Sequence, residues 1–184
     1  MVKKITTTAD VRENVIRLFF DSPRRKYHIR EVASLVGVAP GTAKKYLESM
    51  RETGLLSLRK DKLYDSYTAD MESAEFKSSK VFYVMKKIRD SGLVGFIERE
   101  FNYPAVILYG SASRGEDVED SDIDIFVVAK KCRDVNVDKF SKVIGREIHL
   151  MCMSESDFKS GKNVELTNNV INGIVITGFL EAFE

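Results

Sequence analysis

Two acidic residues separated by one position, Asp122 and Asp124, are the part of this 184-residue chain best suited to chemistry. They begin a run that continues with apolar residues to Val128. This predicts a strand, whose period of two places both carboxylates on one face. Neighbouring carboxylates repel each other, so a cation between them is favoured, and hard oxygen ligands suit Mg²⁺. The pair predicts a metal site.

A glycine–serine pair, Gly110-Ser111, lies before the acidic pair and directly after the short apolar run 105–109, which is typical of a buried strand. Small side chains there let backbone N–H groups and a hydroxyl approach an anion closely. A phosphate cradle beside paired carboxylates is suited to in-line displacement at phosphorus. Each motif alone is common in turns, but the two in this order, with strands on both sides, form a strong signal.

The run Gly110–Gly115, followed by Ser121–Asp124, resembles the signature of the nucleotidyltransferase superfamily related to DNA polymerase β. The resemblance is greatest to its minimal nucleotidyltransferase branch, fused to an N-terminal winged helix as in archaeal proteins of this kind. The broader similarity extends over most of residues 75–184. This resemblance implies that a nucleoside monophosphate passes from a triphosphate, with ATP favoured, to an acceptor hydroxyl, and that pyrophosphate is released.

The same resemblance implies roles for individual residues. Gly110 and Ser111 would hold the β- and γ-phosphates of the triphosphate. Arg114 and Gly115 would shape the following turn. The two aspartates would bind Mg²⁺ and act in catalysis.

A third carboxylate on a later strand belongs to the family pattern, and here that strand is predicted over 146–153. Glu147 is the only carboxylate in this run, so it is assigned as the third catalytic residue, although the family usually has an aspartate. His149 shares its face by the period of two and is the alternative occupant. A histidine there accepts a proton or binds a softer divalent metal, whereas a lone strand histidine is more often structural.

The first third of the chain has a different pattern. Helical apolar spacing predicts helices over 9–20, 28–37 and 42–52, with a glycine-containing turn between the second and third. Alternating residues over 54–67, around a charged tip, predict a β-hairpin. A helix-turn-helix followed by such a hairpin resembles the winged-helix DNA-binding domain.

Duplex DNA is the partner that this second resemblance implies, with the helix 42–52 in the major groove and the hairpin tip at phosphates. The candidate DNA-binding residues are Thr42, Lys44, Lys45, Arg59, Lys60 and Lys62. Residues 1–70 carry 14 basic and 9 acidic residues, a net charge of +5, whereas 71–184 carry 15 and 19, a net charge of −4. Winged helices also serve in protein docking and dimerisation, so a protein partner stays open.

The predicted fold class is α+β, with a winged helix-turn-helix over 1–70, a helical connector over 71–101 and a nucleotidyltransferase domain with a mixed sheet over 102–184. No window approaches the roughly 18 apolar residues of a membrane span. Two cysteines are too few to indicate a disulfide framework or a zinc site, so we expect a reduced, cytoplasmic protein. The oligomeric state is open, with a homodimer as one option.

An alternative function uses the same two modules. In it the protein is a DNA-binding transcriptional regulator or an antitoxin-like partner protein. Its nucleotidyltransferase domain is then catalytically weak or only senses nucleotide, because the third position departs from the family pattern.

Overall fold

The computed structural model describes residues 8–61, 64–161 and 163–180, and the chain divides into two compact units, Met1–Lys80 and Val81–Glu184. The division falls inside helix α4 (Ala74–Asp90), which lies in the segment predicted as a helical connector. Among the described residues, no helix has the length and apolar character that a membrane crossing requires.

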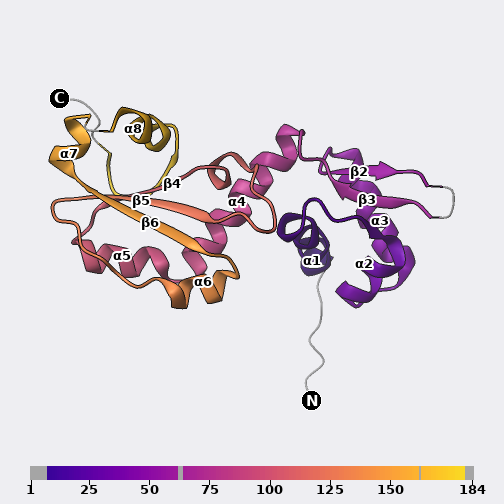
Figure 1. The fold of residues 1–184 in the computed structure, drawn as a ribbon. Helices are drawn as coiled ribbons and strands as arrows, with labels where there is room; N and C mark the ends of the chain where they lie inside the picture. The colour runs from indigo at the N-terminus through magenta and orange to yellow at the C-terminus, as the bar shows by residue number, and fades with distance from the viewer. Residues whose placement is uncertain (1–7, 62–63, 162, 181–184) are drawn as a thin grey trace, which may run out of the picture. The chain divides into compact units, whose positions relative to one another are not determined.

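The first unit is built from helices around a small antiparallel sheet with the order β1-β3-β2 (Figure 1). Its described elements are α1 (Thr8–Asp21), β1 (Tyr27–His28), α2 (Ile29–Val36), α3 (Pro40–Glu52), β2 (Leu56–Arg59) and β3 (Ser66–Ala69). The predicted helices and hairpin are present at these positions. Their identification as a winged helix stays a prediction.

The turn between α2 and α3 follows from its residues. Gly37 ends α2 in the left-handed conformation, with φ of 75°, which glycine adopts at little cost. Helix α3 begins at Pro40, two residues earlier than predicted. Proline is tolerated at the first helical position, because an N–H group there would have no hydrogen-bond partner within the helix. The buried side chains Phe19, Leu47 and Tyr67 then form part of the core of this unit.

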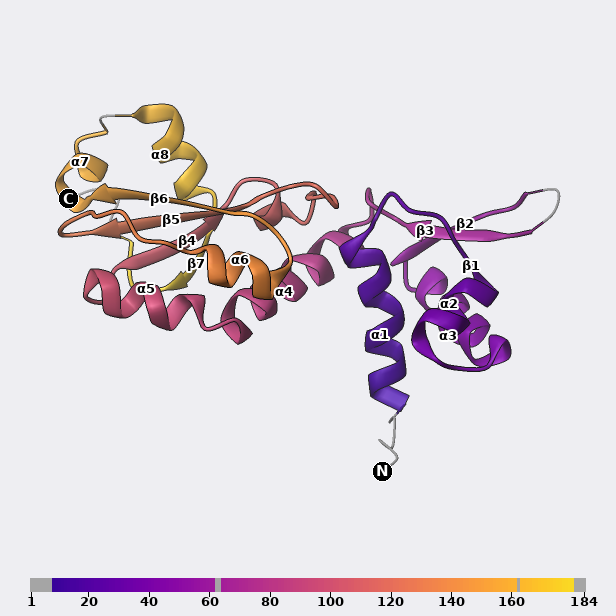
Figure 2. The same cartoon turned by 60° about the horizontal axis from the view of Figure 1, so that its bottom comes forward.

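The second unit contains a mixed sheet, as predicted. Its four strands have the order β6-β5-β4-β7 (Figure 2). Strands β5 and β6 are parallel, and the other two pairings are antiparallel. Besides the end of α4, its described elements are α5 (Leu93–Phe101), β4 (Ala105–Tyr109), the 3₁₀-helix η1 (Ala112–Arg114), β5 (Ile123–Ala129), α6 (Asp138–Ile144), β6 (Ile148–Ser154), α7 (Glu155–Lys159), α8 (Val164–Ile171) and β7 (Ile174–Thr177).

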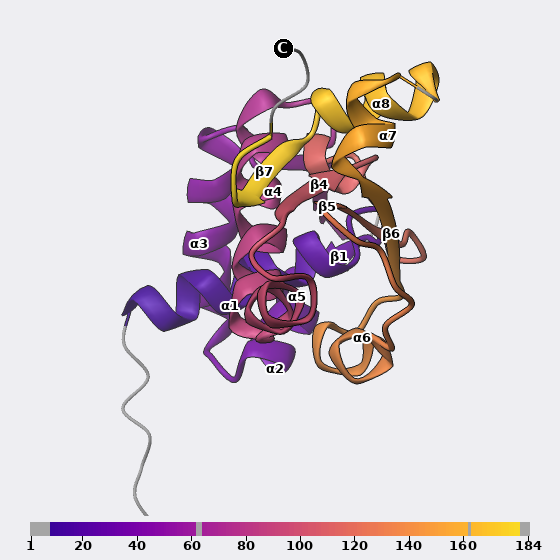
Figure 3. The ribbon, with the colours of Figure 1, turned by 90° about the vertical axis from the view of Figure 1, so that its left-hand side faces the viewer.

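Helices cover the two faces of this sheet unequally (Figure 3). One face packs against the end of α4, α5 and α6 through buried residues such as Ile88, Ile97 and Phe140. On the other face, Phe158 of α7 and Val170 of α8 pack against the half that carries Phe126. Among the described residues, the buried cluster on this second face does not reach the start of β5, where the carboxylates lie.

The C-terminal segment has the closing helix and the short terminal element that apolar spacing over 163–183 indicates. The helix is α8, which ends at Ile171. Residues Ile174–Thr177 form β7, which pairs with β4 as an edge strand of the sheet. Residues 181–183 of the predicted segment lie outside the described residues.

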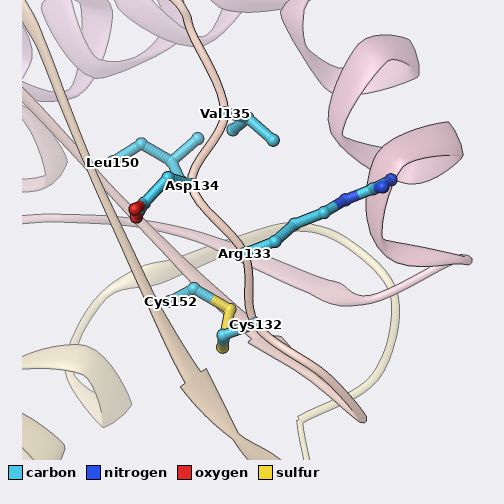
Figure 4. Close-up of a pocket in the computed structure, with 6 residues that line it drawn as sticks. All are labelled: Cys132, Arg133, Asp134, Val135, Leu150 and Cys152. Atoms are coloured by element: carbon cyan, nitrogen blue, oxygen red, sulfur yellow. A yellow bond between two sulfur atoms is a disulfide. The ribbon is translucent and has the colours of Figure 1, made fainter.

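The expectation of unpaired cysteines is wrong, because Cys132 and Cys152 form a disulfide (Figure 4). Cys132 follows the end of β5, and Cys152 lies on the neighbouring strand β6, opposite Val127. The parallel pairing thus brings together two residues that are 20 positions apart. The expectation of a cytoplasmic location was based on reduced cysteines, and the disulfide removes that basis.

A pocket of about 350 Å³ adjoins this disulfide (Figure 4). It is lined by Cys132, Arg133, Asp134, Val135, Leu150 and Cys152. Leu150 and Cys152 pack against the core on the α5 and α6 side, whereas alternation along β6 points His149 to the opposite face. The pocket therefore does not belong to the carboxylate site.

Candidate functional site

A row of three polar side chains crosses the sheet where β5 begins. Asp124 on β5 is the register partner of Tyr109 on β4 and of His149 on β6. Because register partners on neighbouring strands project to the same face, the three side chains form one row, and Asp122 shares that face by the period of two. Pairing of the strands thus brings together residues from three parts of the sequence.

His149 is the centre of this group. Its Nε2 lies 3.6 Å from Asp122 Oδ2 and 3.7 Å from Glu147 Oε1, and its Nδ1 lies 3.9 Å from Asp124 Oδ1. These separations exceed hydrogen-bond length but are within the range of ion pairs. The exposed fraction of the side chain is 28% for Asp124, 53% for His149 and 73% for Glu147. The group is accessible to a ligand.

The predicted phosphate bend lies directly against one of the carboxylates. Gly110 follows β4 with φ of 71°, and a Cβ built on it would lie 2.3 Å from Asp124 Oδ2. Both the backbone angle and this close approach require glycine. The structure therefore places the glycine–serine bend and Asp124 side by side.

Internal hydrogen bonds define the shape of the bend. The Ser113 hydroxyl donates to the Gly110 carbonyl at 2.8 Å, and the Ser111 carbonyl accepts from the Arg114 and Glu116 N–H groups, both at 3.1 Å. Arg114 pairs with the exposed Glu116 at 2.9 Å. Gly115 then ends η1 with φ of 69°. Ser111, Arg114 and Gly115 thus lie in one compact turn after Gly110.

Arg146 is a site residue that sequence reasoning missed. Its guanidinium forms an ion pair with the buried Asp117 and also donates through Nε to the Ser121 carbonyl at 2.7 Å and through a terminal nitrogen to the Asp122 carbonyl at 3.2 Å. It therefore fixes the backbone that leads into β5. No local pattern signals this role, because Arg146 and Ser121 are 25 residues apart in sequence.

Electrostatics at the row disfavour additional negative charge. Burial raises the pKa of Asp124, the neighbouring Asp122 raises it further, and His149 and Arg146 act in the opposite direction. Burial also raises the pKa of Tyr109, and the Asp124 charge adds to that effect. Such a site favours a bound cation, since a positive charge would stabilise the ionised carboxylates.

The donor set fits a divalent cation. One ligand atom each from Asp122, Glu147 and His149 lie within 4.8 Å of one another. Carboxylate oxygens and an imidazole nitrogen are common ligands of divalent metals. The predicted metal ligand Asp124 lies on the other side of the His149 ring, at Nδ1.

The candidate DNA-binding residues occupy the first unit. Thr42, Lys44 and Lys45 are exposed on α3, and Arg59 and Lys60 are exposed at the end of β2. Lys62 lies outside the described residues. Binding of DNA by these side chains stays a prediction.

Residues 93–178 match a family model described as Polymerase beta, Nucleotidyltransferase. The matched range includes Gly110, both aspartates and His149, so the whole carboxylate site lies inside it. The match supports placing the second unit in the nucleotidyltransferase superfamily and indicates nucleotidyl transfer as its general activity. A search of curated proteins and a search of solved structures each gave no match.

Proposed function

We propose that this protein is a Mg²⁺-dependent nucleotidyltransferase that moves a nucleoside monophosphate, with AMP favoured, from a triphosphate to an acceptor hydroxyl. One observation supports this most directly. The His149 ring lies less than 4 Å from a carboxylate oxygen of Asp122 and of Asp124, beside the Gly110 bend. All these residues are inside the range that matches the family model.

In this proposal, one pair of residues binds the phosphates and another pair binds the cation. Gly110 and Ser111 bind the β- and γ-phosphates through backbone N–H groups and the serine hydroxyl. Asp122 and Asp124 would hold the divalent metal. Bound there, it would supply positive charge that offsets the charge of the phosphates during transfer.

Transfer then requires one bond to form and one to break. The acceptor oxygen bonds to the α-phosphorus, the bond from that phosphorus to the bridging oxygen breaks, and pyrophosphate leaves with the electron pair. Glu147, whose side chain is 73% exposed, takes the proton of the acceptor hydroxyl. Arg146 acts as a positioning residue through the Ser121 and Asp122 carbonyls.

A transfer assay tests this function. The protein is incubated with Mg²⁺, each of the four α-phosphate-labelled triphosphates, and protein and RNA extract from its source. We expect label transfer with ATP, loss of transfer in Asp122→Asn plus Asp124→Asn, and retention in Asp120→Asn, which changes an exposed carboxylate outside the cluster. Transfer by the double variant at the wild-type rate, or no transfer from any triphosphate, would contradict the proposal.

A second candidate is a DNA-binding regulator whose second unit senses nucleotide. It is favoured by His149, which lies beside Asp124 where the superfamily resemblance implies a carboxylate, and by the exposed basic side chains of α3 and β2. A salt titration of duplex binding tests it. Lys44→Ala plus Lys45→Ala should weaken binding and reduce the salt slope by about 2, since each phosphate contact contributes about 1.

The matched control is Lys130→Ala plus Lys131→Ala, which removes two exposed lysines of the second unit. It should leave the salt slope unchanged. Lack of duplex affinity at about 50 mM salt, where phosphate contacts are strong, would exclude this candidate.

A further inference from the structure

We propose that the carboxylate cluster selects a first-row transition-metal ion, of the Mn²⁺ to Zn²⁺ series, over Mg²⁺, and that His149 Nε2 is the ligand responsible. The inference rests on the proposed function, because it concerns the same site. It replaces Mg²⁺ in that proposal with an ion selected by the His149 imidazole. In this arrangement Glu147 and His149 join Asp122 as ligands, and Asp124 faces the other ring nitrogen.

The three ligand atoms lie near the spacing of a shared ion, all within 4.8 Å of one another. His149 Nε2 lies 3.6 Å from Asp122 Oδ2 and 3.7 Å from Glu147 Oε1. Ligand bonds of about 2.0–2.2 Å place neighbouring ligands about 3.0–3.6 Å apart in octahedral or tetrahedral geometry. The separations in the structure are longer than this, so binding of one ion requires the side chains to move closer together. The present separations are too long for hydrogen bonds between the ligands themselves.

An imidazole changes which ion this site prefers. Mg²⁺ prefers oxygen ligands and retains several waters, whereas imidazole nitrogen binds Zn²⁺, Co²⁺ and related ions well. Two carboxylates and one imidazole form a mixed set in which affinity increases from Mn²⁺ to Co²⁺ to Zn²⁺. A site of three carboxylates would lack this nitrogen and its preference.

The orientation of the ring is set by the sheet. His149 is the register partner of Asp124, so its Nδ1 faces Asp124 Oδ1 at 3.9 Å while Nε2 faces the other two carboxylates. Metal-binding histidines commonly direct their second nitrogen at a carboxylate, which fixes the tautomer and makes the ligating nitrogen more basic. Asp124 lies on that side of the ring, at ion-pair distance and beyond hydrogen-bond length.

Charge around the cluster favours a cation. Within the described residues, the side-chain ion-pair contacts of Asp122, Asp124 and Glu147 are with the His149 ring. Arg146 bonds the Asp122 carbonyl and pairs with Asp117 instead of with these carboxylates. Three carboxylates around one imidazole leave a net negative site that a divalent ion neutralises.

Metal titration of the nucleotide-free full chain, with any purification tag removed, tests the inference. Calorimetry with Mg²⁺, Mn²⁺ and Co²⁺ should show Co²⁺ bound at least about tenfold more tightly than Mg²⁺, and visible absorption of Co²⁺ should report the nitrogen ligand. His149→Asp should weaken Co²⁺ about 10- to 100-fold and leave Mg²⁺ binding equal or stronger.

Two controls exclude other sources of the signal. His28→Gln changes the other histidine and should leave Co²⁺ binding unchanged, and His149→Asn should lose the cobalt absorption with the fold retained by circular dichroism. Equal affinity for Mg²⁺ and Co²⁺, or a cobalt spectrum that persists in both His149 variants, would overturn the inference.

The outcome is separable from that of the transfer assay, because no triphosphate is present. If transfer fails but Co²⁺ binding depends on His149, the metal selectivity stands without the activity. If transfer occurs with Mg²⁺ alone and His149→Asp has no effect on metal binding, the activity stands and this inference fails.

Discussion

Asp124 and His149 are direct register partners on the parallel strands β5 and β6, with the His149 Nδ1 3.9 Å from Asp124 Oδ1. The backbone hydrogen bonds of two adjacent strands fix this pairing independently of the side chains. Substitution at position 149 therefore changes the chemistry of the site with little change in where its side chain begins. This makes residue 149 the best position at which to separate ligand effects from folding effects.

Gly110→Ala should distort the site. Alanine at φ of 71° costs about 1–2 kcal/mol, and its Cβ would displace Asp124 Oδ2, 2.3 Å away. We expect a loss of at least that much unfolding free energy in urea and loss of label transfer. Gly41→Ala is the control, because no atom lies within 4 Å of its built Cβ and alanine favours helix. Equal stability of the two variants would contradict the requirement for glycine at position 110.

Arg146→Ala should be strongly destabilising. It leaves the carboxylate of Asp117, whose side chain is 1% exposed, without its guanidinium and frees the Ser121 carbonyl. Breaking a buried pair typically costs about 3–5 kcal/mol, and urea unfolding would measure this loss. Arg114→Ala, which breaks the exposed pair with Glu116, should cost less than about 1 kcal/mol. Similar costs for the two variants would refute a buried anchor at Arg146.

Tyr67→Phe should change how the stability of the first unit depends on pH. The buried Tyr67 hydroxyl donates to Glu48, and this hydrogen bond, aided by Arg51, lowers the pKa of Glu48. A lowered carboxyl pKa stabilises the fold at neutral pH, and that stabilisation is lost as the pH falls through the folded-state pKa.

The measurement is urea unfolding at neutral and acidic pH. The wild type should exceed Tyr67→Phe by about 1 kcal/mol at pH 7, and the difference should shrink on acidification. Tyr64→Phe, at a tyrosine that is 70% exposed, should follow the wild type throughout. A constant difference between wild type and Tyr67→Phe at every pH would show that Glu48 is not involved.

Loss of the Cys132–Cys152 disulfide should lower stability. A cross-link between residues 20 positions apart restricts the unfolded chain and contributes about 3 kcal/mol. Cys132→Ser plus Cys152→Ser should therefore unfold at lower urea concentration than the oxidised wild type. Reduction should shift the wild type towards the variant and leave the variant unchanged; a wild type indifferent to reduction would contradict the prediction.

Local patterns in the sequence were sufficient to predict a strand over 122–128, which the structure has at Ile123–Ala129, and the bend before it. The period of two places Asp122 and Asp124 on one face whatever the rest of the chain does, and the Gly110-Ser111 pair marks a turn by residue type alone. The helices of the first unit were predictable for the same reason, because helical spacing and the turn residues act over a few positions.

Nonlocal contacts were not predictable in this way. Whether Glu147 or His149 lies beside Asp124 depends on the register of a parallel pair, which no local rule fixes. The structure assigns that register to His149, while Glu147 reaches the cluster from the residue before β6. The Arg146 anchor and the disulfide likewise join residues that only the folded sheet brings together.

The disulfide encloses a covalent loop, residues 132–152, that contains Arg146, Glu147 and His149. The strand that completes the carboxylate cluster is thus chemically linked to the end of its neighbour. Dithiothreitol, a routine additive in enzyme preparations, would open that loop and give a differently constrained molecule. Comparisons of catalysis or ion affinity between laboratories are meaningful only at a matched buffer redox potential.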